Sequence, residues 1–251
     1  MLGRSRTQLL LLDRLDDESA VRFRQLVRRR AAGLPLQHLT GTAPFRHLEL
    51  LVGPGVFIPR PETELLLELA APALDEATIV IDLCAGSGAI ALAVAQEHPA
   101  VRVVAVERSP AALDWLARNA AARAAAGDRP IELVAADVAD AGLLTELTGA
   151  VDVVLSNPPY VPERIRGELS VEVGHDPHEA VFAGEDGMAL MPALLRTAAR
   201  LLRPGGLVVI EHDESQPEAM LRLLDGGQTW DCAAGSTDLA GRSRFTTAIR
   251  R

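Results

Sequence analysis

The chain has 251 residues and a formal net charge of −9, because 34 Asp and Glu residues outnumber 25 Lys and Arg residues. Hydrophobic residues make up 48% and charged residues 24%, which is typical of folded globular proteins and not of disordered ones. No apolar run approaches the ~20 residues of a membrane-spanning helix. The acidic balance disfavours a general nucleic-acid binder. We therefore expect neither a membrane nor a stable nucleic-acid partner.

The cysteine content indicates the compartment. Cys84 and Cys232 are the only two cysteines, and neither stands in a Cys-x-x-Cys or Cys/His spacing. A disulfide framework or a zinc site is therefore not expected. The sequence predicts a cytoplasmic protein without a metal.

The first 40 residues predict a short helical segment. Helical spacing of apolar residues covers Leu9–Leu15 and Ala20–Ala32, and Gly33 and Pro35 end the second helix. Two such helices bury little surface alone. The segment is expected to dock on the rest of the chain or to be the remnant of a larger helical module.

Residues 41–60 predict a β-hairpin connector. Phe45–Val52 alternates like a strand, Gly53-Pro54-Gly55 predicts the turn, and Val56–Ile58 is the expected returning arm. Pro61 then opens a helix, because proline is tolerated in a first helical turn. This helix begins the expected catalytic domain, residues 61–251.

From Thr78 onward, apolar strands alternate with helices, which indicates a doubly wound, Rossmann-like α/β fold with a parallel sheet. The expected strands are Ile79–Leu83, Val101–Val106, Ile131–Ala135, Val151–Leu155 and Leu207–Ile210. The expected helices are Ala89–Glu97, Pro110–Ala126, Leu143–Leu147 and Gly187–Leu202. The C-terminal stretches Trp230–Ala233 and Arg244–Ile249 predict an antiparallel strand pair at one edge of the sheet.

A glycine-rich loop stands where the first strand meets the first helix. Its candidate binding residues are Asp82, Cys84, Ala85, Gly86, Ser87 and Gly88. Glycines let the backbone approach a ligand, and the following helix offers free N–H groups. Alone, the loop fits NAD, FAD, S-adenosylmethionine or an ordinary tight turn.

The next two strand ends narrow the choice of ligand. Glu107 follows about 20 residues after the loop, where an acid bonds ribose hydroxyls. Asp137 ends the third strand, where it can meet an adenine edge, and Val138 is expected against the adenine face. No third glycine completes the dinucleotide fingerprint. S-adenosylmethionine is therefore favoured, and NAD is a minor alternative.

The candidate catalytic motif, Asn157-Pro158-Pro159-Tyr160, follows the fourth strand. Two prolines restrict the backbone, so the Asn157 side-chain oxygen and the Pro158 carbonyl form a pair of acceptors suited to one –NH2 group. Tyr160 offers a flat face for a planar amide or base. The arrangement favours methyl transfer to an amide or exocyclic nitrogen through positioning and charge stabilisation.

On these residues the sequence resembles the release factor glutamine methyltransferases of the HemK/PrmC type. The resemblance is carried by Gly41–Glu64, Asp82–Ile90, Ser156–Val161, Arg203–Gly206 and Asp238–Arg242. It implies methylation of the Gly-Gly-Gln glutamine of peptide-chain release factors. It also implies that Cys84–Gly88, Glu107 and Val138 hold the methyl donor and that Asn157 contacts both ligands.

The resemblance extends to the pocket wall, with two departures. Phe45, Arg60 and Glu62 are implied near the pocket. The family carries a larger N-terminal helical domain, so residues 1–40 are expected to be a shortened form of it. Cys84 and Ala85 stand where glycine and threonine are common.

Three other functions stay open: adenine N(6) methylation of nucleic acid, glutamine methylation of a ribosomal protein, and a non-catalytic cofactor-binding module. The acidic balance disfavours the first, and a binding module has no use for paired amine acceptors. Gly226-Gly227-Gln228 matches the substrate tripeptide, but a turn is the preferred interpretation. His175-Asp176-Pro177 is expected in a loop over the pocket.

Overall fold

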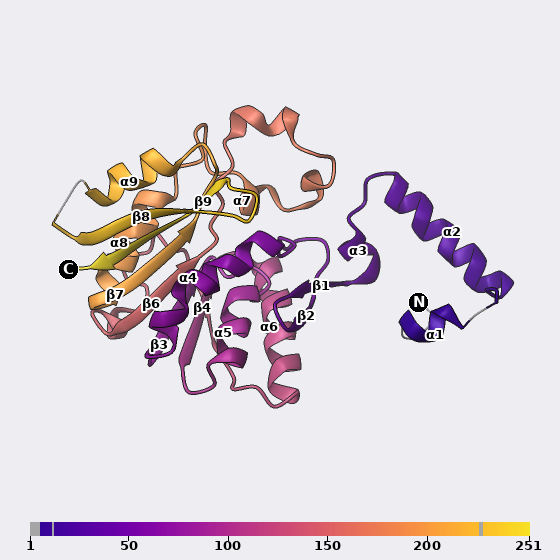
Figure 1. Cartoon of the computed structure of the whole chain (residues 1–251), viewed down its shortest axis with the longest axis horizontal. Coiled ribbons are helices and arrows are strands. Elements are labelled where there is room, and N and C mark those ends of the chain that lie inside the picture. Colours follow the sequence, from indigo (N-terminus) through magenta and orange to yellow (C-terminus); the bar gives the residue numbers. More distant parts are fainter. Residues whose placement is uncertain (1–5, 12, 226–227) are drawn as a thin grey trace.

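The computed structural model describes residues 6–11, 13–225 and 228–251. The N-terminal helices α1 (Arg6–Leu10), α2 (Asp17–Ala31) and α3 (Leu36–Thr40) stand beside the main body (Figure 1). The first helix ends earlier than predicted, and α2 begins after Asp16, whose Oδ1 accepts the Ser19 N–H at 2.7 Å. None of the α2 residues is buried.

A two-stranded hairpin follows, but its turn is not the predicted one. Strands β1 (Thr42–Phe45) and β2 (Leu48–Leu51) pair around Arg46, which has a φ of 52°. The Arg46 Nε donates to Glu97 at 2.6 Å, and its backbone N–H donates to Glu64 at 2.9 Å. These distant contacts stabilise the left-handed turn. The hairpin turn therefore lies at residues 46–47 and not at the predicted residues 53–55. The chain does turn at residues 54–55, but residues 56–58 form no strand.

The central sheet has the strand order β5-β4-β3-β6-β7-β9-β8. Its strands are β3 (Ile79–Leu83), β4 (Arg102–Glu107), β5 (Glu132–Ala135), β6 (Val151–Ser156), β7 (Leu202–Glu211), β8 (Trp230–Thr237) and β9 (Ser243–Arg250). The first five in this order are parallel, and β9 is antiparallel to both β7 and β8. The predicted parallel sheet and C-terminal strand pair are confirmed.

Helices cover both faces of this sheet, as a doubly wound fold requires. On one face pack α4 (Glu64–Leu74), α5 (Ala89–Glu97) and α6 (Pro110–Ala125), and on the other pack α8 (Met191–Leu201) and α9 (Pro217–Asp225) (Figure 1). Both interfaces are apolar, so their burial drives folding. Two short elements, η1 (Pro61–Thr63) and α7 (His178–Val181), lie near the carboxyl ends of the strands.

Two predicted helices differ in the structure. The expected helix at residues 143–147 is a single 3-10 turn, Thr145–Leu147. Helix α8 starts at Met191 and not at Gly187, because Gly187 has a φ of 77° and packs directly against the Tyr160 backbone. Helix α9 was not predicted. The expected turn at Gly226-Gly227 lies outside the described residues. No helix in the described part of the chain is long and apolar enough to span a membrane.

Candidate functional site

A cavity of about 280 Å3 opens at the carboxyl ends of β3, β4 and β6. These strands are neighbours where the direction of winding reverses, which is the usual ligand-binding position in open α/β sheets. The segment 161–181 contributes much of the remaining wall. The expected loop over the pocket at residues 175–177 belongs to this segment.

The predicted site residues gather at this cavity, except Asp82 and Gly88. Those that line it are Cys84, Ala85, Gly86, Ser87, Glu107, Asp137, Val138, Asn157, Pro158, Pro159 and Tyr160. Of the implied wall residues, Phe45 and Arg60 line it. Glu62 does not, and its carboxylate instead lies 3.8 Å from the Arg242 guanidinium.

The glycine loop has a strained backbone with two different roles for its glycines. Cys84, Gly86 and Gly88 all have positive φ, of 65°, 55° and 87°. A Cβ on Gly86 would meet no atom within 4 Å, so this glycine leaves open space beside the cavity. A Cβ on Gly88 would lie 2.4 Å from Leu116 Cδ1, so this glycine permits helix packing. The loop therefore offers an open cradle.

Asp82 supports the loop from below. Its side chain is buried, and Oδ2 accepts the Ala91 N–H at 3.1 Å in the first turn of α5. Oδ1 has no hydrogen-bond partner among the described residues. Burial raises the pKa of the Asp82 carboxyl to about 8. This residue thus holds the helix to the strand end and does not face the cavity.

Glu107 joins the end of β4 to the glycine loop. Its Oε2 accepts the Gly86 N–H at 2.9 Å, and its Oε1 accepts the N–H groups of Arg108 and Ser109 at 2.8 and 2.7 Å. The carboxylate is fixed at the cavity wall by these bonds. Oε1 already accepts two N–H groups, whereas Oε2 accepts one and keeps acceptor capacity for a hydroxyl group.

Asp137 and Val138 form the wall beside Glu107. Asp137 Oδ1 accepts the Ala139 N–H at 2.8 Å, and this bond is the main reason that the pKa of Asp137 is lowered. Its Oδ2 accepts from Arg108 at 3.1 Å. Val138 is buried, and its carbonyl accepts from Thr197 at 2.8 Å. A carboxylate and an apolar surface thus stand together.

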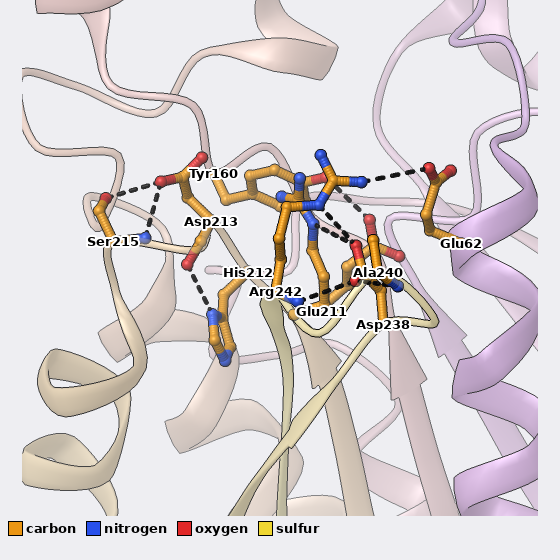
Figure 2. Close-up of polar contacts among 10 residues, drawn as sticks. Glu62, Tyr160, Glu211, His212, Asp213, Ser215, Asp238, Ala240 and Arg242 are labelled. Atoms are coloured by element: carbon orange, nitrogen blue, oxygen red, sulfur yellow. Dashed lines mark hydrogen bonds and ion pairs between the residues drawn. The ribbon is translucent and has the colours of Figure 1, made fainter.

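The Asn-Pro-Pro-Tyr motif is anchored by side chains from other elements. Asn157 Nδ2 donates to Thr63 Oγ1 at 3.0 Å. The Tyr160 hydroxyl donates to Glu211 Oε1 at 2.8 Å (Figure 2). Gln216 Nε2 donates to the Tyr160 carbonyl at 2.8 Å. Burial is the first cause that raises the pKa of Tyr160 well above its ordinary value.

Sequence reasoning missed several residues around this motif. Thr63 and Arg244 line the cavity, and Glu211 lies directly behind Tyr160. A signal existed for Glu211, because it follows the apolar run Leu207–Ile210 at the end of a strand, as Glu107 does in β4. Figure 2 shows it beside the loop that carries Asp238 and Arg242, whose side chains bond at 3.0 Å.

The segment 161–181 is tied to the N-terminal part of the chain. The Asp176 side chain is fully buried, accepts the Ile58 N–H at 3.1 Å and pairs with Arg60. Arg30 of α2 pairs with Glu172 at 2.6 Å. A Cβ on Gly33 would lie 2.7 Å from Val171. The wall of the cavity therefore also touches the N-terminal helical segment.

The residues present fit S-adenosylmethionine. Gly86 gives the open cradle, Glu107 provides a fixed carboxylate for ribose hydroxyls, and Val138 provides an apolar surface for adenine. No three His, Cys, Asp or Glu side chains in the described part of the chain are grouped to hold a metal ion. The fold and this site define an S-adenosylmethionine-dependent methyltransferase.

Comparison with known proteins identifies the family. Residues 48–173 match the methyltransferase small domain, and residues 1–41 match the PrmC N-terminal domain. The chain is 48% identical to the release factor glutamine methyltransferase of Mycolicibacterium smegmatis, covering 99% of this chain and 86% of that protein. It is 47% identical to that of Streptomyces coelicolor, covering 93% and 82%. The chain belongs to the release factor glutamine methyltransferase family.

Two further similarities are more distant. A 4-amino-L-phenylalanine/4-methylamino-L-phenylalanine methyltransferase of Streptomyces pristinaespiralis is 38% identical, covering 85% of this chain and 73% of that protein. The catalytic domain of hMettl16, solved with an RNA hairpin, superposes with a TM-score of 0.64 at 13% identity, covering 88% and 80%. The latter similarity shows the fold alone.

Proposed function

We propose that this protein transfers the methyl group of S-adenosylmethionine to the side-chain amide nitrogen of the Gly-Gly-Gln glutamine of peptide-chain release factors. One observation carries the proposal: the Asn157–Tyr160 motif lines the same cavity as the glycine loop and Glu107. An amine-binding motif thus stands beside a methyl-donor site. The high identity to release factor glutamine methyltransferases supports this substrate.

The chemistry follows from the acceptors. An amide nitrogen is a weak nucleophile because its lone pair is delocalised into the carbonyl. Asn157 Oδ1 and the Pro158 carbonyl can accept hydrogen bonds from its two N–H groups. These hydrogen bonds orient the nitrogen and stabilise the positive charge that develops there. When bound, S-adenosylmethionine would supply the methyl group from its sulfonium, whose S–CH3 bond breaks to leave a neutral thioether, and the methylated nitrogen becomes neutral by losing one of its N–H protons to water. Tyr160 packs against the planar amide.

We further propose that residues 61–251 form the catalytic domain, that residues 41–60 connect it to the N-terminal segment, and that residues 1–40 help to hold the release factor. The apolar side chains that α2 exposes support the last role. A cytoplasmic location follows from this substrate.

The test is mass spectrometry of a release factor incubated with the protein and S-adenosylmethionine. We expect one methyl group on the Gly-Gly-Gln glutamine. Asn157→Ala removes one acceptor and is expected to lower kcat by about 100-fold while circular dichroism stays unchanged. Turnover at the wild-type rate in this variant would contradict the proposed role of Asn157.

The same assay separates the other substrates. Methyl groups found on nucleic acid would support adenine N(6) methylation. Methyl groups found on a ribosomal protein would support glutamine methylation of that protein. Methylation of free 4-amino-L-phenylalanine, with none on the release factor, would support an activity like that named for the Streptomyces pristinaespiralis relative. Saturable donor binding without transfer to any of these would leave a binding module.

A further inference from the structure

The turn between β8 and β9 carries Asp238–Arg242, a stretch of the family resemblance to which the proposed function gives no role. Strand β9 is antiparallel to both β7 and β8. Glu211, the last residue of β7, pairs with Phe245 near the start of β9. The turn therefore lies at the carboxyl edge of the sheet, which is the edge at which the cavity opens.

Two ion pairs connect this turn with the surroundings of the cavity. The Arg242 guanidinium lies 3.8 Å from Glu62, which is next to the cavity residue Thr63 (Figure 2). Arg244, which lines the cavity, has its Nε 3.8 Å from Asp238 Oδ2. A protein that places one of its side chains in the cavity must therefore pass beside the turn.

Hydrogen bonds within the turn hold it in one conformation. Asp238 Oδ1 accepts the N–H groups of Ala240 and Arg242, both at 2.9 Å, and Oδ2 accepts Arg242 Nε at 3.0 Å. The backbone N–H of Asp238 donates to the Arg242 carbonyl at 2.8 Å. The Asp238 side chain is only 1% exposed. A partner that binds such a preformed turn causes little loss of conformational entropy.

Leu239 is presented to solvent by this rigid turn. It is 93% exposed, which is the highest value among the large hydrophobic residues of the described chain. Single exposed apolar residues are common on protein surfaces. Leu239 differs from such residues because a fixed turn holds it at the edge where the cavity opens, without placing it in the cavity wall. A partner at this edge could bury almost its whole side chain.

We propose that Leu239 is a docking residue for the release factor and packs against an apolar surface beside the segment that carries the Gly-Gly-Gln glutamine. The inference rests on the proposed function and adds a contact at the cavity to the one proposed for α2. The release factor must cover this edge of the sheet for its glutamine to reach Asn157. Because Leu239 does not line the cavity, it contributes to binding of the protein substrate and not to methyl transfer.

The first test measures the affinity for a full-length release factor. Calorimetry in the presence of S-adenosylhomocysteine allows binding without methyl transfer. We expect Leu239→Ser to raise the Kd for the release factor about tenfold, because it removes the apolar contact. Leu239→Met keeps an apolar side chain and should bind almost as the wild-type protein does. The matched control is Leu223→Ser on α9, which should leave the Kd unchanged.

The other properties of Leu239→Ser separate docking from support of the fold. Its kcat at saturating release factor, its Kd for S-adenosylmethionine and its melting temperature should equal the wild-type values. A higher Kd for the release factor that comes with a lower melting temperature or weaker donor binding would overturn the inference, and so would an unchanged Kd. If the wild-type protein binds the release factor but methylates no glutamine, only the proposed function is wrong.

A second readout places the contact at the turn itself. Leu239→Cys is combined with Cys232→Ser, because Cys232 is exposed and would also be labelled. Burial raises the pKa of the Cys84 thiol, so this cysteine reacts slowly. A solvent-sensitive fluorophore attached at position 239 should shift its emission to shorter wavelength when the release factor binds, whereas the same label introduced through Leu223→Cys should not. An emission at position 239 that does not change on binding would contradict docking through this turn.

Discussion

Glu107 fixes the conformation of the glycine loop and is also the proposed acceptor for a ligand hydroxyl. Its carboxylate accepts three backbone N–H groups, one of them from Gly86 in the glycine loop. A hydrogen bond to a charged group contributes about 1.5–3 kcal/mol. Loss of this carboxylate therefore removes the anchor of the loop as well as the proposed acceptor for ribose.

We predict that Glu107→Ala weakens the binding of S-adenosylmethionine at least about tenfold in isothermal calorimetry. The matched control is Glu146→Ala, which removes the same charge from an exposed position away from the cavity. Equal affinity in both variants, or a preference for NAD in the wild-type protein, would contradict the assignment of the donor site.

Asp82 makes the stability of the folded protein fall as pH rises, which is unusual for a carboxyl group. The pKa of this carboxyl is raised to about 8 from its ordinary 3.8. Between these values the folded protein keeps a proton that the unfolded chain releases, so its contribution to stability falls as pH rises. Above pH 8 the contribution stays constant.

We predict that Asp82→Asn raises the melting temperature at pH 8 by roughly 5 °C or more and changes it little at pH 4, because asparagine carries no charge to bury. Thermal unfolding of the ligand-free protein at both values measures this. The exposed Asp114→Asn is the control. A difference that is equal at both pH values would rule out the raised pKa as its cause.

At the scale of elements, the turn from β3 to α5 contains one glycine that permits helix packing and another that leaves open space for a ligand. We predict that Gly88→Ala lowers the melting temperature, because its Cβ would overlap Leu116. Gly86→Ala should cost less stability, since its Cβ meets only open space, but that methyl group enters the donor cradle. Calorimetry should show weaker donor binding in Gly86→Ala. The opposite pattern would mean that the roles of the two glycines are reversed.

The elements also show what could be predicted from the sequence. Strands β3, β4 and β6 were predicted almost to the residue because both faces of each are buried, which produces continuous apolar runs. The hairpin turn was misplaced because Arg46 is held by Glu97, 51 residues away. Local turn residues at 53–55 gave no indication of this distant ion pair.

The candidate site likewise contains residues that could be predicted from the sequence and residues that could not. Asn157 and the glycine loop belong to contiguous motifs and were predicted. Thr63 and Glu211 were not predicted, because each contacts the motif only once the chain is folded, Thr63 at Asn157 and Glu211 at Tyr160. No local spacing relates residues that are 94 positions apart, as Thr63 and Asn157 are.

At the scale of the whole molecule, the N-terminal segment contributes little to the core. Helix α2 stands beside the main body (Figure 1). It has no buried residue, and its Phe23 is 50% exposed. We predict that Phe23→Ser leaves the melting temperature unchanged but raises the KM for a full-length release factor about tenfold, because it removes apolar docking surface. The KM for a short Gly-Gly-Gln peptide should not change.

The control for this prediction is Leu223→Ser, which replaces a 39% exposed leucine on α9. It should change neither the KM for the full-length release factor nor the KM for the peptide. An equal effect of Phe23→Ser on the peptide and the full-length factor would exclude docking through α2.

The segment 161–181 connects the cavity with the surface of the N-terminal helical segment. It lines the cavity, and its Glu172 and Val171 contact the end of α2 and Gly33. If a protein bound at α2 shifts this segment, the affinity of the cavity for its ligand changes, and thermodynamic reciprocity then requires the ligand to change the affinity for that protein by the same factor. Measuring either affinity with and without the other ligand therefore yields the coupling free energy between the two surfaces.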